Sequence, residues 1–143
     1  MKIAFLLFPF LCLSALLQAK SMPCPGCPAW FNPSHQRNSV CLSEKELVAH
    51  IATQKPIEPP GLREPHMNSH GIVVACLCFS RQGTVTEIRI LSGPAIMQQS
   101  TIESLKDWTF RPAKKGERLY GGCGTLRIHV DMKDSIVTTT IEE

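Results

Sequence analysis

The sequence has no apolar run of the roughly 20 residues that a membrane-spanning helix needs. Its longest apolar run covers residues 3–17, and Pro9 interrupts it. A basic stripe is also missing, because the 15 lysines and arginines are scattered, 12 acidic residues oppose them, and the formal net charge is only +3. We therefore expect no nucleic-acid-binding surface.

The short motifs that mark common active sites are absent as well. The sequence contains no G-x-S-x-G nucleophile turn, no H-E-x-x-H zinc-binding pair and no glycine-rich phosphate-binding loop. Scattered acidic residues such as Glu103 and Asp107 fit the solvent-exposed face of a helix. We expect a protein that is not an enzyme and that uses no cofactor and no metal.

The first 19 residues have the pattern of a cleaved secretion signal. Lys2 gives the N-terminal segment a positive charge, and the apolar run follows. Residues of the kind accepted at signal-peptide cleavage sites then precede a cleavage point after Ala19. We therefore expect a periplasmic or secreted protein without a stable membrane anchor. The expected organisation is a signal peptide at residues 1–19, a cysteine-rich arm with a short helix at 20–55, a domain at 56–132 and a tail at 133–143.

Cysteine usage agrees with export, because six cysteines remain after Cys12 leaves with the signal peptide. An even number of cysteines in a small exported chain favours disulfides over free thiols, although spacing alone does not choose the pairing. The disulfide candidates are Cys24, Cys27, Cys41, Cys76, Cys78 and Cys123.

Hydrophobic periodicity predicts the first secondary-structure elements of the body. Ser43 and Glu46 have capping-box spacing, which predicts a short helix over residues 44–54. Residues 72–79 and 84–91 read as two strands, joined by a hairpin in which Gly83 can adopt a positive φ.

The two faces of this hairpin follow if Phe79 lies opposite Thr84. The core face then carries Val73, Ala75, Leu77 and Phe79 together with Thr86, Ile88 and Ile90, and the other face carries Cys76 and Cys78 together with Val85, Glu87 and Arg89.

A second helix and a third strand complete the expected fold. Apolar residues at three-residue intervals predict a helix over residues 97–108, a loop follows at 114–122, and strict alternation predicts a strand over 124–130. The chain directions then give an α+β fold, in which a three-stranded antiparallel sheet has the order third, first, second and one helix packs on one of its faces.

Strand parity also suggests how the cysteines pair. Cys123 has the parity of Thr125, which places it on the face of Cys76 and Cys78, so we expect a cross-strand bridge from Cys123 to one of them. A bridge between Cys76 and Cys78 is disfavoured because side chains two apart on a strand lie parallel and too far apart. The remaining strand cysteine is then available to the arm, which Trp30 and Phe31 would pack onto the body.

Assembled in this order, the elements resemble the C-terminal domain of the TonB energy transducers over residues 56–132. The similarity is carried by Gly71-Ile72-Val73, by Gly83-Thr84-Val85-Thr86-Glu87-Ile88-Arg89-Ile90-Leu91-Ser92-Gly93, by Trp108-Thr109-Phe110-Arg111-Pro112 and by Gly122-Cys123-Gly124-Thr125-Leu126-Arg127-Ile128.

The resemblance implies a periplasmic module that docks on outer-membrane transporters and receives a peptide by strand addition beside its last strand. An edge strand has unpaired amides and carbonyls that such a peptide can satisfy. The expected partner-binding edge is Gly124, Thr125, Leu126, Arg127, Ile128, His129 and Val130. In the alternative, charged side chains keep another strand from pairing with this edge, or the tail at residues 136–141 covers it.

The sequence departs from the TonB pattern in two respects. We find no counterpart of the membrane anchor or of the long proline-rich spacer, and the cysteine-rich arm is additional. We therefore expect a stand-alone relative, a monomer or weak dimer, that does not transmit force by itself.

Two other functions compete with protein binding. Cys24 and Cys27 form a C-x-x-C pair that could cycle between dithiol and disulfide, and Cys24, Cys27, His35 and Cys41 offer the atom types of a zinc site. A purely structural envelope protein is the remaining alternative. His66 and His70 are expected to be loop residues.

Overall fold

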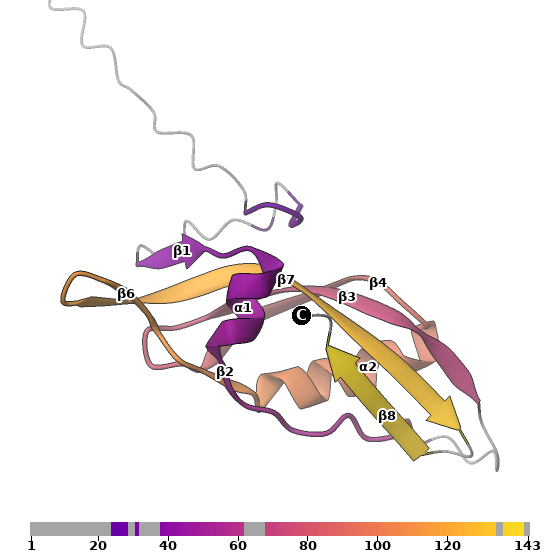
Figure 1. Cartoon of the computed structure of the whole chain (residues 1–143). Coiled ribbons are helices and arrows are strands. Elements are labelled where there is room, and N and C mark those ends of the chain that lie inside the picture. The colour runs from indigo at the N-terminus through magenta and orange to yellow at the C-terminus, as the bar shows by residue number, and fades with distance from the viewer. Residues whose placement is uncertain (1–23, 29–30, 32–37, 62–67, 134–135, 142–143) are drawn as a thin grey trace, which may run out of the picture.

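A computed structural model of the chain describes residues 24–28, 31, 38–61, 68–133 and 136–141 (Figure 1). The predicted signal peptide lies outside the described residues, as do Trp30, His35 and His66. The described part contains two helices and two sheets.

A six-stranded sheet forms the body of the protein, and its longest strand is β7, Arg118–Lys133. One edge of β7 pairs with β3, Ser69–Phe79, which in turn pairs with β4, Val85–Ser92. The opposite edge carries β1, Ser39–Cys41, in parallel and β8, Ile136–Ile141, in antiparallel orientation. The sixth strand, β6, Ala113–Lys115, forms a hairpin with the start of β7.

The predicted three-stranded sheet is therefore wrong, although the mixed α+β content is found. β7, β3 and β4 lie in the expected relative order, but three further strands join β7. Two of them have only three residues each, which is too short to show a periodic pattern. The expected loop at residues 114–122 belongs mostly to the β6–β7 hairpin, where Gly121 and Gly122 weaken the strand signal.

The first helix, α1, Glu44–His50, begins as predicted but ends four residues early. Residues 51–53 form β2, Ile51–Thr53, which pairs with β5, Thr109–Phe110, in a separate two-stranded sheet. Arg111 holds the chain where it leaves α1 and enters β2, since its amide donates to His50 O and its guanidinium donates to Ala49 O at 2.7 Å. A long-range strand pairing therefore overrides the local helical pattern.

The N-terminus of α1 carries the predicted capping box. The Glu46 amide donates to Ser43 Oγ at 3.3 Å, and the Glu46 carboxylate accepts from the Ser43 amide at 2.8 Å. The Ser43 hydroxyl also donates to this carboxylate at 2.8 Å, and the two bonds that the carboxylate accepts from Ser43, the one from the amide first, hold the pKa of Glu46 below its usual value. The stabilisation that this capping box gives α1 is fully present above the ordinary carboxyl pKa, and it is lost as the pH falls through the lowered pKa.

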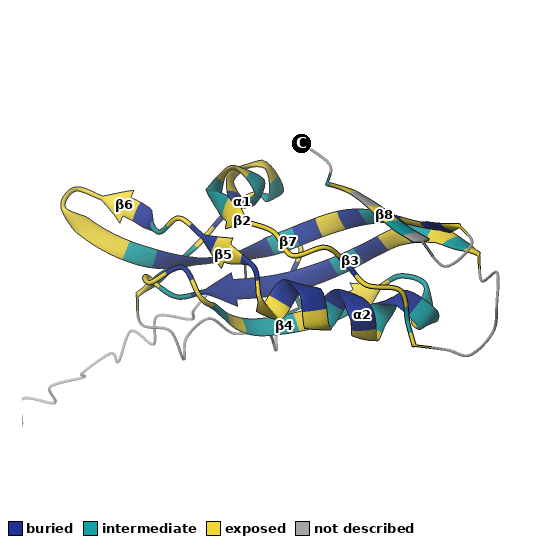
Figure 2. Ribbon diagram, turned by 90° about the horizontal axis from the view of Figure 1, so that it is seen from below, coloured by how far each residue is buried: buried dark blue, intermediate teal, exposed yellow. Residues whose placement is uncertain are grey.

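The second helix, α2, Ala95–Lys106, lies against β4 and β3 on the core side of the sheet (Figure 2). Val73, Ala75, Leu77 and Phe79 are fully buried there, which confirms the predicted core face of β3. The register shifts between Cys78 and Phe79, so Val85 lies opposite Phe79 and packs on the core. Its predicted place on the other face is therefore wrong.

The β3–β4 hairpin depends on Gly83. This residue has φ +84°, and its carbonyl accepts from the Phe110 amide at 2.9 Å. A Cβ atom on Gly83 would lie 2.0 Å from Phe110 O. The turn therefore requires glycine both for its backbone conformation and for its contact with β5.

Replacing Gly83 by alanine is expected to destabilise the protein more than replacing Gly116. Gly116 also has a positive φ, of 62°, but a Cβ there meets no atom within 4 Å. Gly116→Ala should cost about 1–2 kcal/mol for the backbone conformation alone, and Gly83→Ala about 1–3 kcal/mol more for the clash. Urea unfolding of both variants measures the difference, and equal losses would contradict the contact with Phe110.

Candidate functional site

The edge of β7 that the sequence offered for partner binding is already occupied. β8 pairs with residues 128–133 of β7, and β1 pairs with residues 121–123 (Figure 1). Between these strands α1 lies beside β7, and the Arg127 amide donates to Glu44 Oε1 at 2.9 Å. The expected edge position of residues 124–130 is therefore corrected, because the tail strand β8 covers residues 128–130, as in the alternative drawn from the sequence, and α1 lies beside the residues before them.

The side chains of this segment still alternate between the two faces of the sheet. Leu126, Ile128 and Val130 are buried in the core, whereas Arg127 is exposed and Thr125 and His129 are half-buried on the opposite face. We call this opposite face, which carries Cys76, Cys78 and Arg127, the outer face. Ile128 is fully buried, so a proline there would unfold the protein instead of testing an edge.

The described part of the sheet has its long unpaired edge at β4 instead. Within residues 24–28, 31, 38–61, 68–133 and 136–141, β4 pairs only with β3, apart from a single bridge between Thr84 and Thr109 just before the strand begins. The strand has eight residues and an exposed pattern at Thr86, Arg89, Leu91 and Ser92. An unpaired strand of this length can accept another strand.

The register shows which amides of β4 point outward. The Arg127 amide faces α1, so Gly124 and Leu126 of β7 face β3, where they pair with Leu77 and Ala75. Because hydrogen-bonding direction alternates along a strand, Cys76 and Cys78 face β4 instead. Their partners are Arg89 and Glu87, so the amides and carbonyls of Ile88 and Ile90 point away from the sheet.

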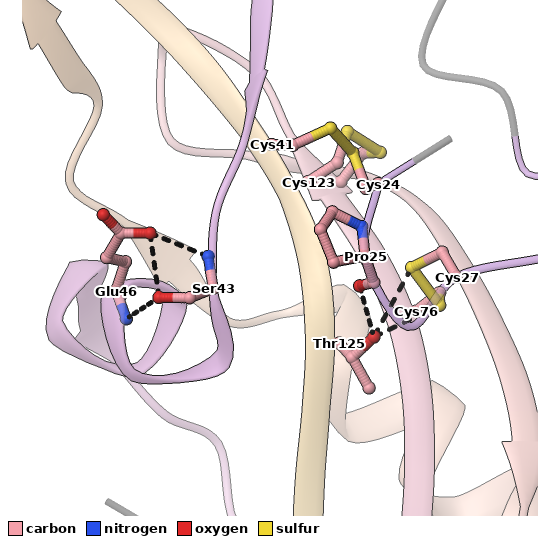
Figure 3. Close-up of a disulfide and its surroundings, with 10 residues drawn as sticks. Cys24, Pro25, Cys27, Cys41, Ser43, Glu46, Cys76, Cys123 and Thr125 are labelled. Carbon is pink, nitrogen blue, oxygen red and sulfur yellow. Dashed lines mark hydrogen bonds between the residues drawn. A yellow bond between two sulfur atoms is a disulfide. The ribbon is translucent and has the colours of Figure 1, made fainter. Parts of the chain in front are cut away.

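The outer face beside β4 is covered at one end by the cysteine-rich arm. Disulfides join Cys24 to Cys41, Cys27 to Cys76 and Cys78 to Cys123 (Figure 3). All of these cysteines except the exposed Cys41 form, with Phe31, a second buried cluster on the side of the sheet opposite α2. The predicted bridge from Cys123 to a strand cysteine is confirmed, as are the bridge from the other strand cysteine to the arm and the packing of Phe31.

Thr125 forms the polar contact between the arm and the sheet. Its hydroxyl donates to Pro25 O at 3.4 Å and lies 3.6 Å from Cys27 Sγ and 3.7 Å from Cys76 Sγ (Figure 3). A Cβ on Gly26, whose φ is +81°, would lie 2.6 Å from this hydroxyl. The sequence placed Thr125 on the outer face but gave no sign that it would hold the arm.

The C-x-x-C pair does not close on itself in this structure. Cys24 and Cys27 belong to different disulfides, and the second of these reaches 49 residues along the chain into β3. A dithiol–disulfide cycle between adjacent C-x-x-C thiols needs both sulfurs to bond each other. The zinc alternative loses its thiolates in the same way, because Cys24, Cys27 and Cys41 are all in disulfides.

A shallow groove of about 500 Å³ lies on the outer face away from the arm. Two cross-strand rows line it on β3, β7 and β8: His70, Asp131 and Thr138 form the first, and Ile72, His129 and Thr140 the second. His70 lies in β3, which corrects its expected position in a loop. In the described part of the chain, no three His, Cys, Asp or Glu side chains are grouped closely enough to hold a metal ion.

The chain matches no protein-family model, no curated protein and no solved structure. The resemblance to the TonB C-terminal domain therefore stays a prediction. Neither of the two described helices is long and apolar enough to cross a membrane. The three disulfides indicate an oxidising environment outside the cytoplasm.

Proposed function

We propose that this protein is a periplasmic protein-binding module that takes an extended segment of a partner polypeptide beside β4. The observation that supports the proposal is the eight-residue edge of β4, which has no partner strand among the described residues. The outward amides and carbonyls of Ile88 and Ile90 can pair with such a segment by strand addition. The binding mode expected from the sequence is kept, but its place moves from the last long strand to the opposite edge.

The rigidity of β4 favours this role. The strand pairs with β3, which two disulfides tie to the arm and to β7, and α2 supports it from the core side. A preorganised edge loses little conformational entropy when a partner strand is added. The resemblance to the TonB domain makes a segment of an outer-membrane transporter the first partner to test.

Proline at position 88 is expected to abolish partner capture. It removes an amide that points away from β3, so the β3–β4 ladder keeps its hydrogen bonds while an added strand loses one. A pull-down from periplasmic extract with wild type and Ile88→Pro measures the effect, and we expect at least a tenfold drop in each specific partner.

The matched control is Ile88→Val, which keeps the amide and the branched side chain and loses only one methylene. It should capture the same partners as wild type. Circular dichroism must show that Ile88→Pro is folded, because Ile88 also packs on the core. Identical partner sets for wild type and a folded Ile88→Pro would refute capture of a periplasmic partner by strand addition at β4.

A further inference from the structure

Two opposite charges flank Ile88 on β4. Glu87 and Arg89 lie on the outer face, where they pair across the strands with Cys78 and Cys76. Their side chains remain 40% and 57% exposed, and Arg89 Nε lies 3.9 Å from Glu87 Oε1. Along this edge an acidic residue therefore precedes Ile88, and a basic residue follows it.

This pattern is complementary to itself under a two-fold rotation. If two copies of β4 pair in antiparallel orientation with Ile88 opposite Ile88, Glu87 of each copy lies opposite Arg89 of the other. Two ion pairs then form on the outer face, related by symmetry. Centring the pair on position 87 or 89 instead would place two glutamates or two arginines opposite each other.

The backbone supports the same register. The amide and carbonyl of Ile88 point away from β3, so Ile88 of the two copies can exchange both hydrogen bonds at the two-fold axis. Glu87 and Arg89 then form non-hydrogen-bonded pairs, in which side chains lie closest together. On the core face, Ile88 meets Ile88 of the second copy.

We propose that the polypeptide received by the β4 edge is a second copy of this chain, which gives a symmetric dimer with one sheet running through both subunits. This inference rests on the proposed function, because it names the partner of the same edge. Register shifts flank the segment that runs from Glu87 to Ile90, so the shared ladder is short. The dimer is therefore weak, since a short ladder buries little surface.

Charge reversal tests the register in the intact protein. Sedimentation velocity over a concentration series should show a dimer for wild type, and about 10- to 100-fold weaker association for Glu87→Arg and for Arg89→Glu. The double variant with both reversals restores the opposite charges and should associate within about threefold of wild type, which also shows that the edge still folds.

Mixing the two single variants gives the sharpest result. One chain then carries two basic residues and the other two acidic residues, so each repels its own copy and pairs with the other. We expect an equimolar mixture to form a heterodimer about as strongly as wild type forms its dimer. If the mixture associates no more strongly than each single variant does alone, the proposed register is overturned.

The outcomes separate this inference from the proposed function. A wild-type protein that stays monomeric up to about 1 mM would overturn self-pairing, and so would a dimer that is insensitive to both charge reversals. In either case, loss of partner capture in Ile88→Pro but not in Ile88→Val would leave strand addition at β4 standing. A charge-dependent dimer, combined with equal partner capture by wild type and Ile88→Pro, would refute capture of a periplasmic partner at this edge and leave self-pairing standing.

Discussion

Replacing both Cys78 and Cys123 by alanine should lower the free energy of unfolding by about 2–5 kcal/mol. The bridge joins the two central strands of the sheet, β3 and β7, across 45 residues of chain. Both cysteines are fully buried, so their loss also removes packing from the cluster under the arm. Guanidinium unfolding under non-oxidising and non-reducing conditions measures the loss, and the other four cysteines keep their partners.

The matched control is the removal of the bridge from Cys24 to Cys41 by the same double substitution. That bridge closes only 17 residues and joins the arm to β1 instead of joining the central strands. The loop-length dependence alone makes its contribution about 1 kcal/mol smaller. A larger loss for Cys24 and Cys41 than for Cys78 and Cys123 would contradict a sheet held mainly by its central bridge.

Replacing Trp108 by alanine should destabilise the protein by about 3–5 kcal/mol. The indole is only 3% exposed, and its Nε1 donates to Lys55 O at 3.0 Å and to Ser104 Oγ at 3.1 Å. It therefore fixes the segment after β2 against the end of α2, in addition to filling the core. Thermal unfolding followed by circular dichroism measures the effect without relying on tryptophan fluorescence.

Trp108→Phe separates packing from hydrogen bonding. Phenylalanine keeps an aromatic ring in the core but removes the donor, while the Ser104 hydroxyl still donates to Lys55 O at 2.5 Å. Because Lys55 O keeps that donor, we expect a loss of only about 1–2 kcal/mol. A loss as large as that of alanine would mean that the hydrogen bonds, and not the ring, account for most of the stabilisation.

Strong local patterns made the central elements predictable from the sequence. Alternation fixed the buried face of β3, and the parity of Cys123 identified its disulfide partner as one of two cysteines. The capping box placed the start of α1 at Glu44. Each of these signals lies within a few residues and depends on side-chain direction, which the backbone of a strand or helix dictates.

Which edge of the sheet lacks a partner strand among the described residues was not predictable in the same way. β1 has three residues, and β8 consists of isoleucine, valine and threonine, which are all β-branched, without clear alternation between polar and apolar types. Whether such a segment joins a sheet depends on a partner far away in the chain. The resemblance drawn from the sequence implied an edge-binding mode at β7, although β1 and β8 pair with that edge of β7 and, among the described residues, β4 is the strand that pairs only with β3.

The disulfide pairing sets an order on maturation. During synthesis Cys24, Cys27 and Cys41 appear first, and only one native bridge, Cys24 to Cys41, can close among them. Cys27 finds its partner only once Cys76 has followed 49 residues later, so early oxidation of the arm can trap it with a neighbouring cysteine. A protein that emerges unfolded into an oxidising compartment must then exchange thiols before its arm can lie on the finished sheet.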